Sequence, residues 1–69
     1  EPEPSTDTIR KIIHDLNGEL FLIRGNAELA LDEVSKDSLV YRNLNQIMER
    51  TDALSALASR LRAKQTEHE

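Results

Sequence analysis

Apolar residues recur along the first half of the chain with a strictly alternating spacing. Between Ile9 and Val34, successive apolar positions are separated by 4, 3, 4, 3, 4, 3 and 4 residues. This heptad spacing places their side chains in one stripe along an α-helix, so it predicts a first helix of about 24 residues. The stripe consists of Ile9, Ile13, Leu16, Leu20, Ile23, Ala27, Ala30 and Val34. The candidate N-caps lie just upstream and are Ser5, Thr6 and Asp7.

A second stripe with the same alternation follows a short polar segment. It consists of Val40, Leu44, Ile47, Thr51, Leu54, Ala58 and Leu61. The segment between the stripes, residues 32–38, has the length and polarity of a helix–helix connection. The alternative caps for the second helix are Ser35, Asp37 and Ser38. Because a short connection makes consecutive helices antiparallel neighbours, the chain is predicted to be an all-α, antiparallel two-helix hairpin.

A single hairpin would leave half of each stripe in contact with water. A chain of 69 residues without cysteine has few other means of stabilisation. We therefore expect two copies to form a homodimeric four-helix bundle, which would bury both stripes. Flanking apolar residues widen the stripes as a bundle requires; they are Ile12, Leu31, Leu39, Tyr41, Met48 and Leu57. The alternative is a hairpin that packs on other domains of its own parent protein.

Composition narrows the possible roles and suggests the domain limits. The net charge of −4 argues against a nucleic-acid partner, and no apolar run approaches the length of a membrane span, so no membrane insertion by this segment is expected. The lack of cysteine fits a cytoplasmic setting, although the parent protein could be membrane-anchored elsewhere. We interpret residues 1–7 as the end of an interdomain linker, 8–63 as the helical hairpin and 64–69 as a polar tail.

The face of the first helix opposite the stripe has an unusual composition. His14 lies about 160° around the helix from Leu16, on the solvent side. The same face carries Arg10, Lys11, Asn17, Gly18, Phe21, Gly25 and Glu28, with Leu22 and Leu29 beside it. A glycine inside a helix costs about 1 kcal/mol relative to alanine, and two of them one heptad apart lower the surface so that another molecule can approach. This combination predicts a docking surface, although single exposed apolar residues are common and need no such explanation.

The cluster with a chemical interpretation is His14-Asp15-Leu16-Asn17. Exposed imidazoles titrate near neutral pH, so part of the population is unprotonated and nucleophilic. The carboxylate of Asp15 could accept a proton or hold the ring tautomer, which makes it a candidate general base. Asn17, about one turn further along the helix, could hydrogen-bond phosphate oxygens or water. Neither His14 nor His68 has neighbours at metal-ligand spacing, so no metal site is expected.

Residues 14–29, H-D-L-N-G-E-L-F-L-I-R-G-N-A-E-L, resemble the phosphoacceptor helix of sensor histidine kinases. They are most similar to the group with the pattern H-D-[FL]-N-N-x-L, an aliphatic residue, x, G, x, A-E-L. The segment from Ile47 to Thr51 and the Ala- and Leu-rich stretch after it are similar to the family's second hairpin helix. The similarity spans Ile9 to Arg62, which is nearly the whole chain.

The resemblance implies roles for individual residues. His14 would be the phosphoacceptor and Asp15 its activator. A partner-binding strip would dock the receiver domain of a response regulator. This strip comprises Phe21, Leu22, Gly25, Asn26 and Leu29. Two positions depart from the pattern. Gly18 replaces the Asn or Thr linked to regulator dephosphorylation, which puts phosphatase activity in doubt. Glu19 replaces a proline common in the family, so no kink is expected there.

The resemblance also implies partners outside the chain. No segment is similar to a nucleotide-binding domain, so ATP and Mg are expected on a separate catalytic domain of the same parent, and the hairpin itself is expected to hold no cofactor. His14 would pass its phosphoryl group to a regulator Asp. Two alternatives remain open at this point. One is a phosphotransfer protein or degenerate kinase relative, and the other is a purely structural dimerisation bundle with a fortuitous His-Asp pair.

Overall fold

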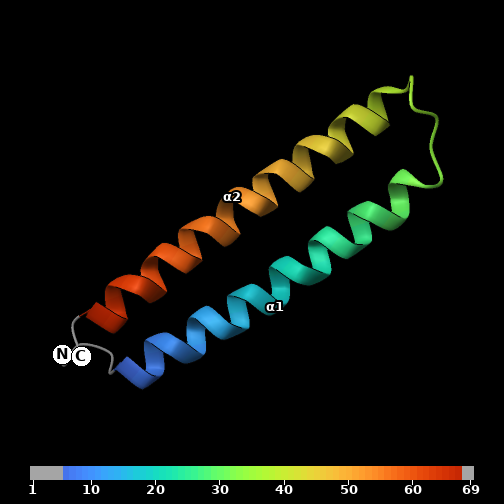
Figure 1. The fold of residues 1–69 in the computed structure, drawn as a ribbon. Coiled ribbons are helices and arrows are strands. Elements are labelled where there is room, and N and C mark those ends of the chain that lie inside the picture. The colour runs from blue at the N-terminus through green and yellow to red at the C-terminus, as the bar shows by residue number, and fades with distance from the viewer. Residues whose placement is uncertain (1–5, 68–69) are drawn as a thin grey trace.

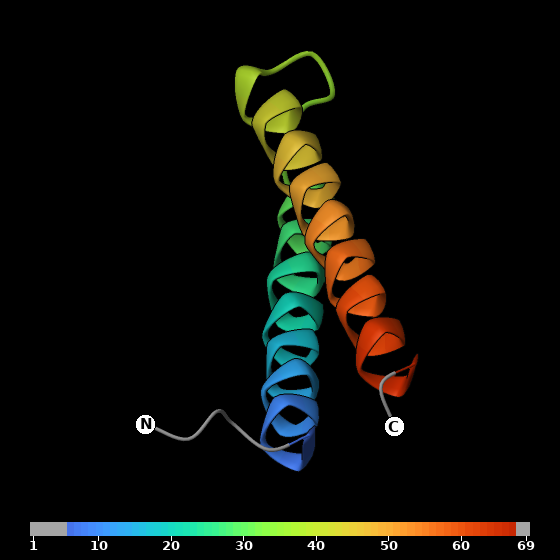
Figure 2. The ribbon, with the colours of Figure 1, turned by 90° about the vertical axis from the view of Figure 1, so that its left-hand side faces the viewer.

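A computed structural model describes residues 6–67, with side chains from 7 to 64. Within that range the chain forms two long helices, α1 (Thr6–Leu31, 26 residues) and α2 (Leu39–Glu67, 29 residues), and no strand. The helices run antiparallel, so the start of α1 and the end of α2 lie at the same end of the hairpin, opposite the connection (Figure 1). The second view shows that the two helix axes cross at an angle (Figure 2). The predicted all-α hairpin is confirmed.

The connection between the helices comprises residues 32–38, as the polar segment predicts. Ser38 is the cap that the sequence left undecided, because its Oγ accepts a hydrogen bond from the Tyr41 amide at 3.1 Å. The same hydroxyl donates to the Ser35 carbonyl at 2.6 Å, and the Asp37 amide donates to Ser35 Oγ at 3.3 Å. The second helix therefore starts from a turn held by two serines.

The outer helix ends differ from the prediction. Because α1 begins at Thr6, Thr6 and Asp7 are helical residues and not caps; Ser5 lies outside the described residues. Asp7 instead places a carboxylate in the first turn, where it interacts favourably with the helix dipole. At the other end α2 continues to Glu67, into the segment interpreted as a polar tail. Residues 62–67 contain no Gly or Pro, so nothing in that segment stops the helix.

The core of the hairpin uses alternate members of the two stripes. The most buried side chains, at 1–5% exposure, are Ile13, Leu20, Ala27, Thr51 and Ala58. The antiparallel register sets a large side chain against a small one at each level, which lets the helices approach closely. Leu20 and Thr51 line one hollow together, and so do Ala27 and the half-buried Leu44. The Thr51 hydroxyl is satisfied by donating to the Ile47 carbonyl at 2.8 Å.

Six exposed members of the two stripes form what we call the apolar edge of the hairpin. They are Leu16 (39% exposed), Ile23 (47%), Val40 (52%), Ile47 (43%), Leu54 (47%) and Leu61 (47%). Ile23 and Ile47 line both hollows along this edge, and Leu54 lines one of them. A single hairpin therefore leaves part of each stripe in contact with water, although in the first stripe only Leu16 and Ile23 are exposed. A second copy on this edge remains a proposal.

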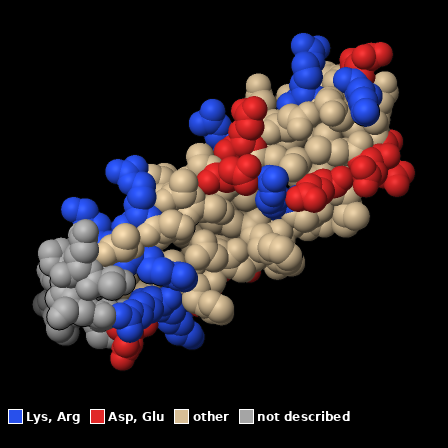
Figure 3. All heavy atoms as spheres, viewed as in Figure 1, with Lys and Arg blue, Asp and Glu red and all other residues tan. Residues whose placement is uncertain are grey.

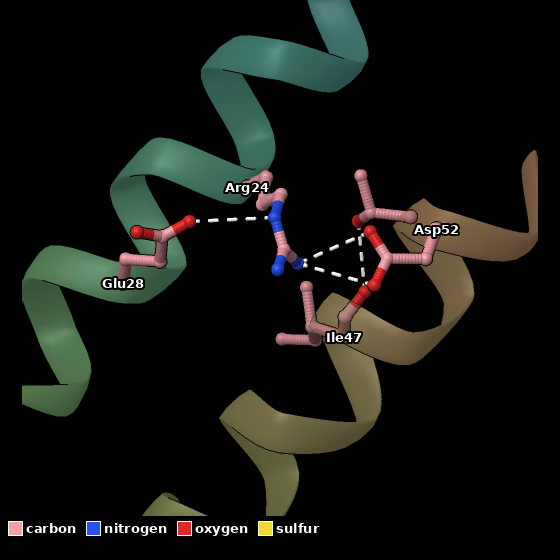
Figure 4. Close-up of polar contacts among 5 residues, drawn as sticks. Arg24, Glu28, Ile47 and Asp52 are labelled. Carbon is pink, nitrogen blue, oxygen red and sulfur yellow. Dashed lines mark hydrogen bonds and ion pairs between the residues drawn. The ribbon is translucent and has the colours of Figure 1, made fainter. Parts of the chain in front are cut away.

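The opposite edge of the hairpin is polar. Arg24 Nη1 lies 3.1 Å from Asp52 Oδ1 and 3.3 Å from Asp52 Oδ2, and Arg24 Nε lies 3.3 Å from Glu28 Oε1 (Figure 4). Around each helix the buried residues lie between this ion pair and the apolar edge. The Arg24 and Asp52 side chains are 38% and 60% exposed, so the pair contributes only about 0.2–1 kcal/mol. Its main consequence is that charged side chains stand on this edge, whereas aliphatic side chains line the other edge.

Candidate functional site

His14 lies in the third turn of α1 and is exposed to solvent. The residue before it, Ile13, is the most deeply buried side chain of the hairpin at 1% exposure. Because consecutive helical residues diverge by about 100°, burial of Ile13 against α2 holds His14 away from the core. The structure therefore places the His14 imidazole on the outer surface of α1, as the stripe predicts.

The two polar residues predicted to assist His14 have different surroundings. Asp15 is exposed, and no hydrogen bond or ion pair joins it to the His14 ring within the part of the chain that the structure describes. Asn17 is half-buried on the side of α1 that turns toward the polar edge. Asp15 would need to turn its side chain back toward the ring to act on it. Their roles as activator and phosphate contact remain predictions.

The five residues predicted to bind a partner lie together. Phe21, Leu22, Gly25, Asn26 and Leu29 line one shallow hollow on the outer face of α1, together with Glu28 and Asp32. We call this surface the docking strip. Its large apolar side chains are Phe21, Leu22 and Leu29, which are 75%, 57% and 68% exposed. The burial of the hairpin core does not explain these side chains, because none of them contacts α2 closely enough to be shielded.

The two glycines of this face have no structural reason to be glycine. A Cβ added at Gly18 or at Gly25 would meet no atom within 4 Å. Neither residue has a positive φ angle. Both therefore carry the helix penalty of glycine without relieving a clash or allowing a special backbone conformation. What they do provide is a low surface: Gly18 between His14 and Phe21, and Gly25 within the docking strip itself.

Asp32 belongs to the docking strip although sequence reasoning assigned it only to the connection. It follows Glu28 by four residues, so the two carboxylates lie one above the other at the end of the strip. Both also line a neighbouring polar hollow with Lys36 and Tyr41. Rotation around the helix could have identified Asp32, because it lies on the same side as His14. Asp32 was not assigned to this face because residues 32–38 are polar and were interpreted only as a connection.

Asn26 lies between the docking strip and the apolar edge. Its side-chain amide donates to the Leu22 carbonyl at 3.0 Å, so it is held against α1. It lines the hollow of the docking strip and also a hollow on the apolar edge, beside Ile23 and Ile47. The two surfaces are therefore continuous along this side of α1.

Comparisons with known proteins do not identify the chain. No protein-family model, curated protein or solved structure matches it significantly. Among the described side chains, no three His, Asp or Glu residues gather into a group that could bind a metal ion. Neither α1 nor α2, as far as they are described, has an apolar stretch that could cross a lipid bilayer.

Proposed function

We propose that this chain is the dimerisation and phosphoacceptor hairpin of a sensor histidine kinase, with His14 as the phosphorylated residue. The observation that carries this proposal is the arrangement of the outer face of α1. An exposed imidazole is followed along one side of the helix by two unexplained glycines and an exposed apolar strip. A nucleophile that must meet two different protein partners requires this kind of accessible position.

The proposed chemistry consists of two phosphoryl transfers. An unprotonated nitrogen of His14 attacks the γ-phosphorus of ATP, the substrate held by a separate catalytic domain. The N–P bond forms while the P–O bond to ADP breaks, with the electron pair leaving on the ADP oxygen. The proton on the other ring nitrogen passes to Asp15 or to solvent. In the second transfer a carboxylate oxygen of a regulator Asp attacks the phosphorus, and the N–P electron pair returns to the ring, which takes up a proton.

The docking strip would position the regulator for the second transfer. Phe21 lies seven residues beyond His14, which corresponds to about 10 Å along the helix. A receiver domain seated on Phe21, Leu22 and Leu29 would therefore reach the phosphorylated ring without any movement of the hairpin. The open space over Gly18 and Gly25 would let its backbone approach closely.

The apolar edge supports the homodimer in this proposal. Two hairpins joined edge to edge would shield six half-exposed aliphatic side chains from each copy. His14 would stay outside the bundle, since it lies about 160° around α1 from Leu16 of the apolar edge, and the large side chains of the docking strip also point away from the core. Dimerisation and phosphoryl transfer would therefore use different surfaces of the same helix.

The test combines the chain with the catalytic domain of its parent protein and radiolabelled ATP. We expect an acid-labile, base-stable phosphate on His14, which is lost in His14→Gln. His68→Gln is the matched control, because His68 is the only other histidine of the chain, and it should be labelled like the wild type. Absence of label from the wild-type chain, or equal labelling of His14→Gln, would contradict the proposal.

A purely structural dimerisation module is the second candidate. It is favoured by one observation, that Asp15 makes no hydrogen bond to the His14 ring. This candidate predicts that His14→Ala leaves both dimerisation and partner binding unchanged. A phosphotransfer protein would differ again, because it would take label from a phosphorylated regulator with no ATP-binding domain present.

A further inference from the structure

The turn of α1 that precedes His14 carries two cations that the proposed reaction has not used. Arg10 and Lys11 stand four and three residues before His14, and both are exposed. Around the helix they lie on either side of His14, about 40° and 60° away. Residues three and four apart are neighbours on a helix surface, with Cβ atoms about 5–6 Å from one another. The imidazole is thus flanked by positive charge one turn toward the N-terminus.

The direction of helical side chains brings the imidazole toward this turn. Each Cα–Cβ bond is tilted toward the helix N-terminus, so a side chain covers the turn before its own Cα. The ring of His14 can therefore reach back over the turn of Arg10 and Lys11, while Gly18, on the other side, leaves open space. A group bound to the outer ring nitrogen would be within reach of both long cationic side chains.

The charge of a phosphoryl group makes these neighbours important. A phosphoryl group carries about −1.5 to −2 charges near neutral pH, and Asp15 adds another negative charge beside it. The next cation along α1, Arg24, lies ten residues beyond His14 and contacts Asp52 and Glu28. Lys and Arg side chains also gather at the end of the hairpin where α1 begins and α2 ends (Figure 3). They are Arg10, Lys11, Arg60, Arg62 and Lys64, five of the nine in the chain.

We infer that Arg10 and Lys11 bind the phosphoryl oxygens at His14, both as the group arrives from its donor and while it is attached to the ring. This inference rests on the proposed function, because it assigns the ligand of the same site. Arg10 offers a planar fork of N–H donors and Lys11 a compact point charge, and both are common partners of phosphate oxygens. Together they offset the repulsion between a polyanionic donor and Asp15.

A spectroscopic experiment tests this inference without a kinase. The full chain carrying His68→Gln is phosphorylated on His14 with phosphoramidate, a small chemical donor, and the phosphorus resonance is followed by NMR against pH. Nearby cations favour the doubly charged phosphoryl group, so their removal should raise its pKa. We expect a rise of about 0.5 for Lys11→Gln and about twice that for the variant that also carries Arg10→Gln.

Matched variants separate this effect from a structural one. Lys11→Arg keeps the charge and should keep the wild-type titration, whereas Arg42→Gln removes an exposed cation far from His14 and should change nothing. The effect should shrink in 1 M salt, where exposed charges are screened. With the catalytic domain present, the double variant should lose about fivefold in kcat/KM for the hairpin.

The outcomes distinguish the inference from the proposed function. An unchanged phosphorus titration in the double variant would overturn the inference, whatever the kinase assay gives. If the wild-type chain takes no label from ATP, the proposed function fails, and an unchanged titration would then overturn the binding site as well. If labelling succeeds and the titration shifts with both cations, Arg10 and Lys11 are established as phosphoryl-binding residues.

Discussion

Replacing the two helical glycines by alanine should make the protein more stable and its docking strip less effective. Gly18 and Gly25 lie in the middle of α1, and an added methyl group at either position would meet no atom within 4 Å. Both have φ values that any residue adopts. The hairpin therefore has no structural reason to resist Gly18→Ala or Gly25→Ala.

The expected gain follows from helix propensity alone. Each replacement should raise the free energy of unfolding by about 0.5–1 kcal/mol, because alanine loses less backbone entropy on folding than glycine. The two positions are about 10 Å apart along the helix and share no partner, so the gains should add. For a domain of this size, 1 kcal/mol corresponds to a rise in Tm of about 4–8 °C.

The assay is thermal and urea unfolding followed by circular dichroism, with all variants at one protein concentration because a dimer melts in a concentration-dependent way. Partner binding is measured beside it, as the rate of phosphoryl transfer from phosphorylated His14 to the regulator. If the partner approaches the backbone at the glycines, a methyl group there should slow transfer about tenfold, since overpacking a close contact costs on the order of 1–3 kcal/mol. The control is Ser59→Ala, on the exposed surface of α2. This variant should gain a little stability and leave the rate of phosphoryl transfer unchanged.

Two results would refute this reasoning. A loss of stability in either glycine variant would mean that some surface, of the same hairpin or of a second copy, already packs against the glycine. A gain in stability with undisturbed transfer would mean that the low surface is not used for docking. The predicted combination is informative because increased stability and decreased function arise from the same methyl group.

Three further predictions concern the fold. Leu54→Glu places a charge on the apolar edge and should shift the chain from dimer to monomer in sedimentation equilibrium, whereas Ala53→Glu, an exposed neighbour, should leave the dimer intact. Ser38→Ala removes the cap of α2 and should cost about 1 kcal/mol in urea unfolding; an unchanged midpoint would show that water replaces the hydroxyl. Asp52→Asn should cost about 0.2–1 kcal/mol at low salt and nothing in 1 M salt, so a salt-independent loss would contradict a simple ion pair with Arg24.

Much of the fold could be predicted from spacing alone. The two heptad stripes predict the hairpin, and the polar run predicts the connection at residues 32–38. The cap of α2 could not be predicted, because Ser35, Asp37 and Ser38 all carry suitable oxygens and the choice depends on the turn that the chain adopts. The helix α2 extends to Glu67, into the segment that its composition identifies only as a polar tail, because that segment has no Gly or Pro to end the helix.

The features of the candidate site were likewise predictable only in part. The exposed position of His14 and the grouping of the docking strip both follow from rotation around a single helix, so the sequence was sufficient for them. The contact between Arg24 and Asp52 was not predictable, because these residues are 28 positions apart and meet only in one register of the two helices. Local spacing predicts faces, whereas contacts between helices require the register.

The unlike edges of the hairpin have a consequence for how an assembly of such chains would grow. A protein that self-associates through two opposite surfaces can add further copies without limit and form sheets or fibres. In this hairpin the two edges differ, because one carries six half-exposed aliphatic side chains and the other carries Arg24, Asp52 and Glu28. Two hairpins that paired through their apolar edges would turn these charged edges outward, so a third hairpin could not add through an edge. The ion pair would then limit pairing between edges to two copies while adding little to the strength of the association.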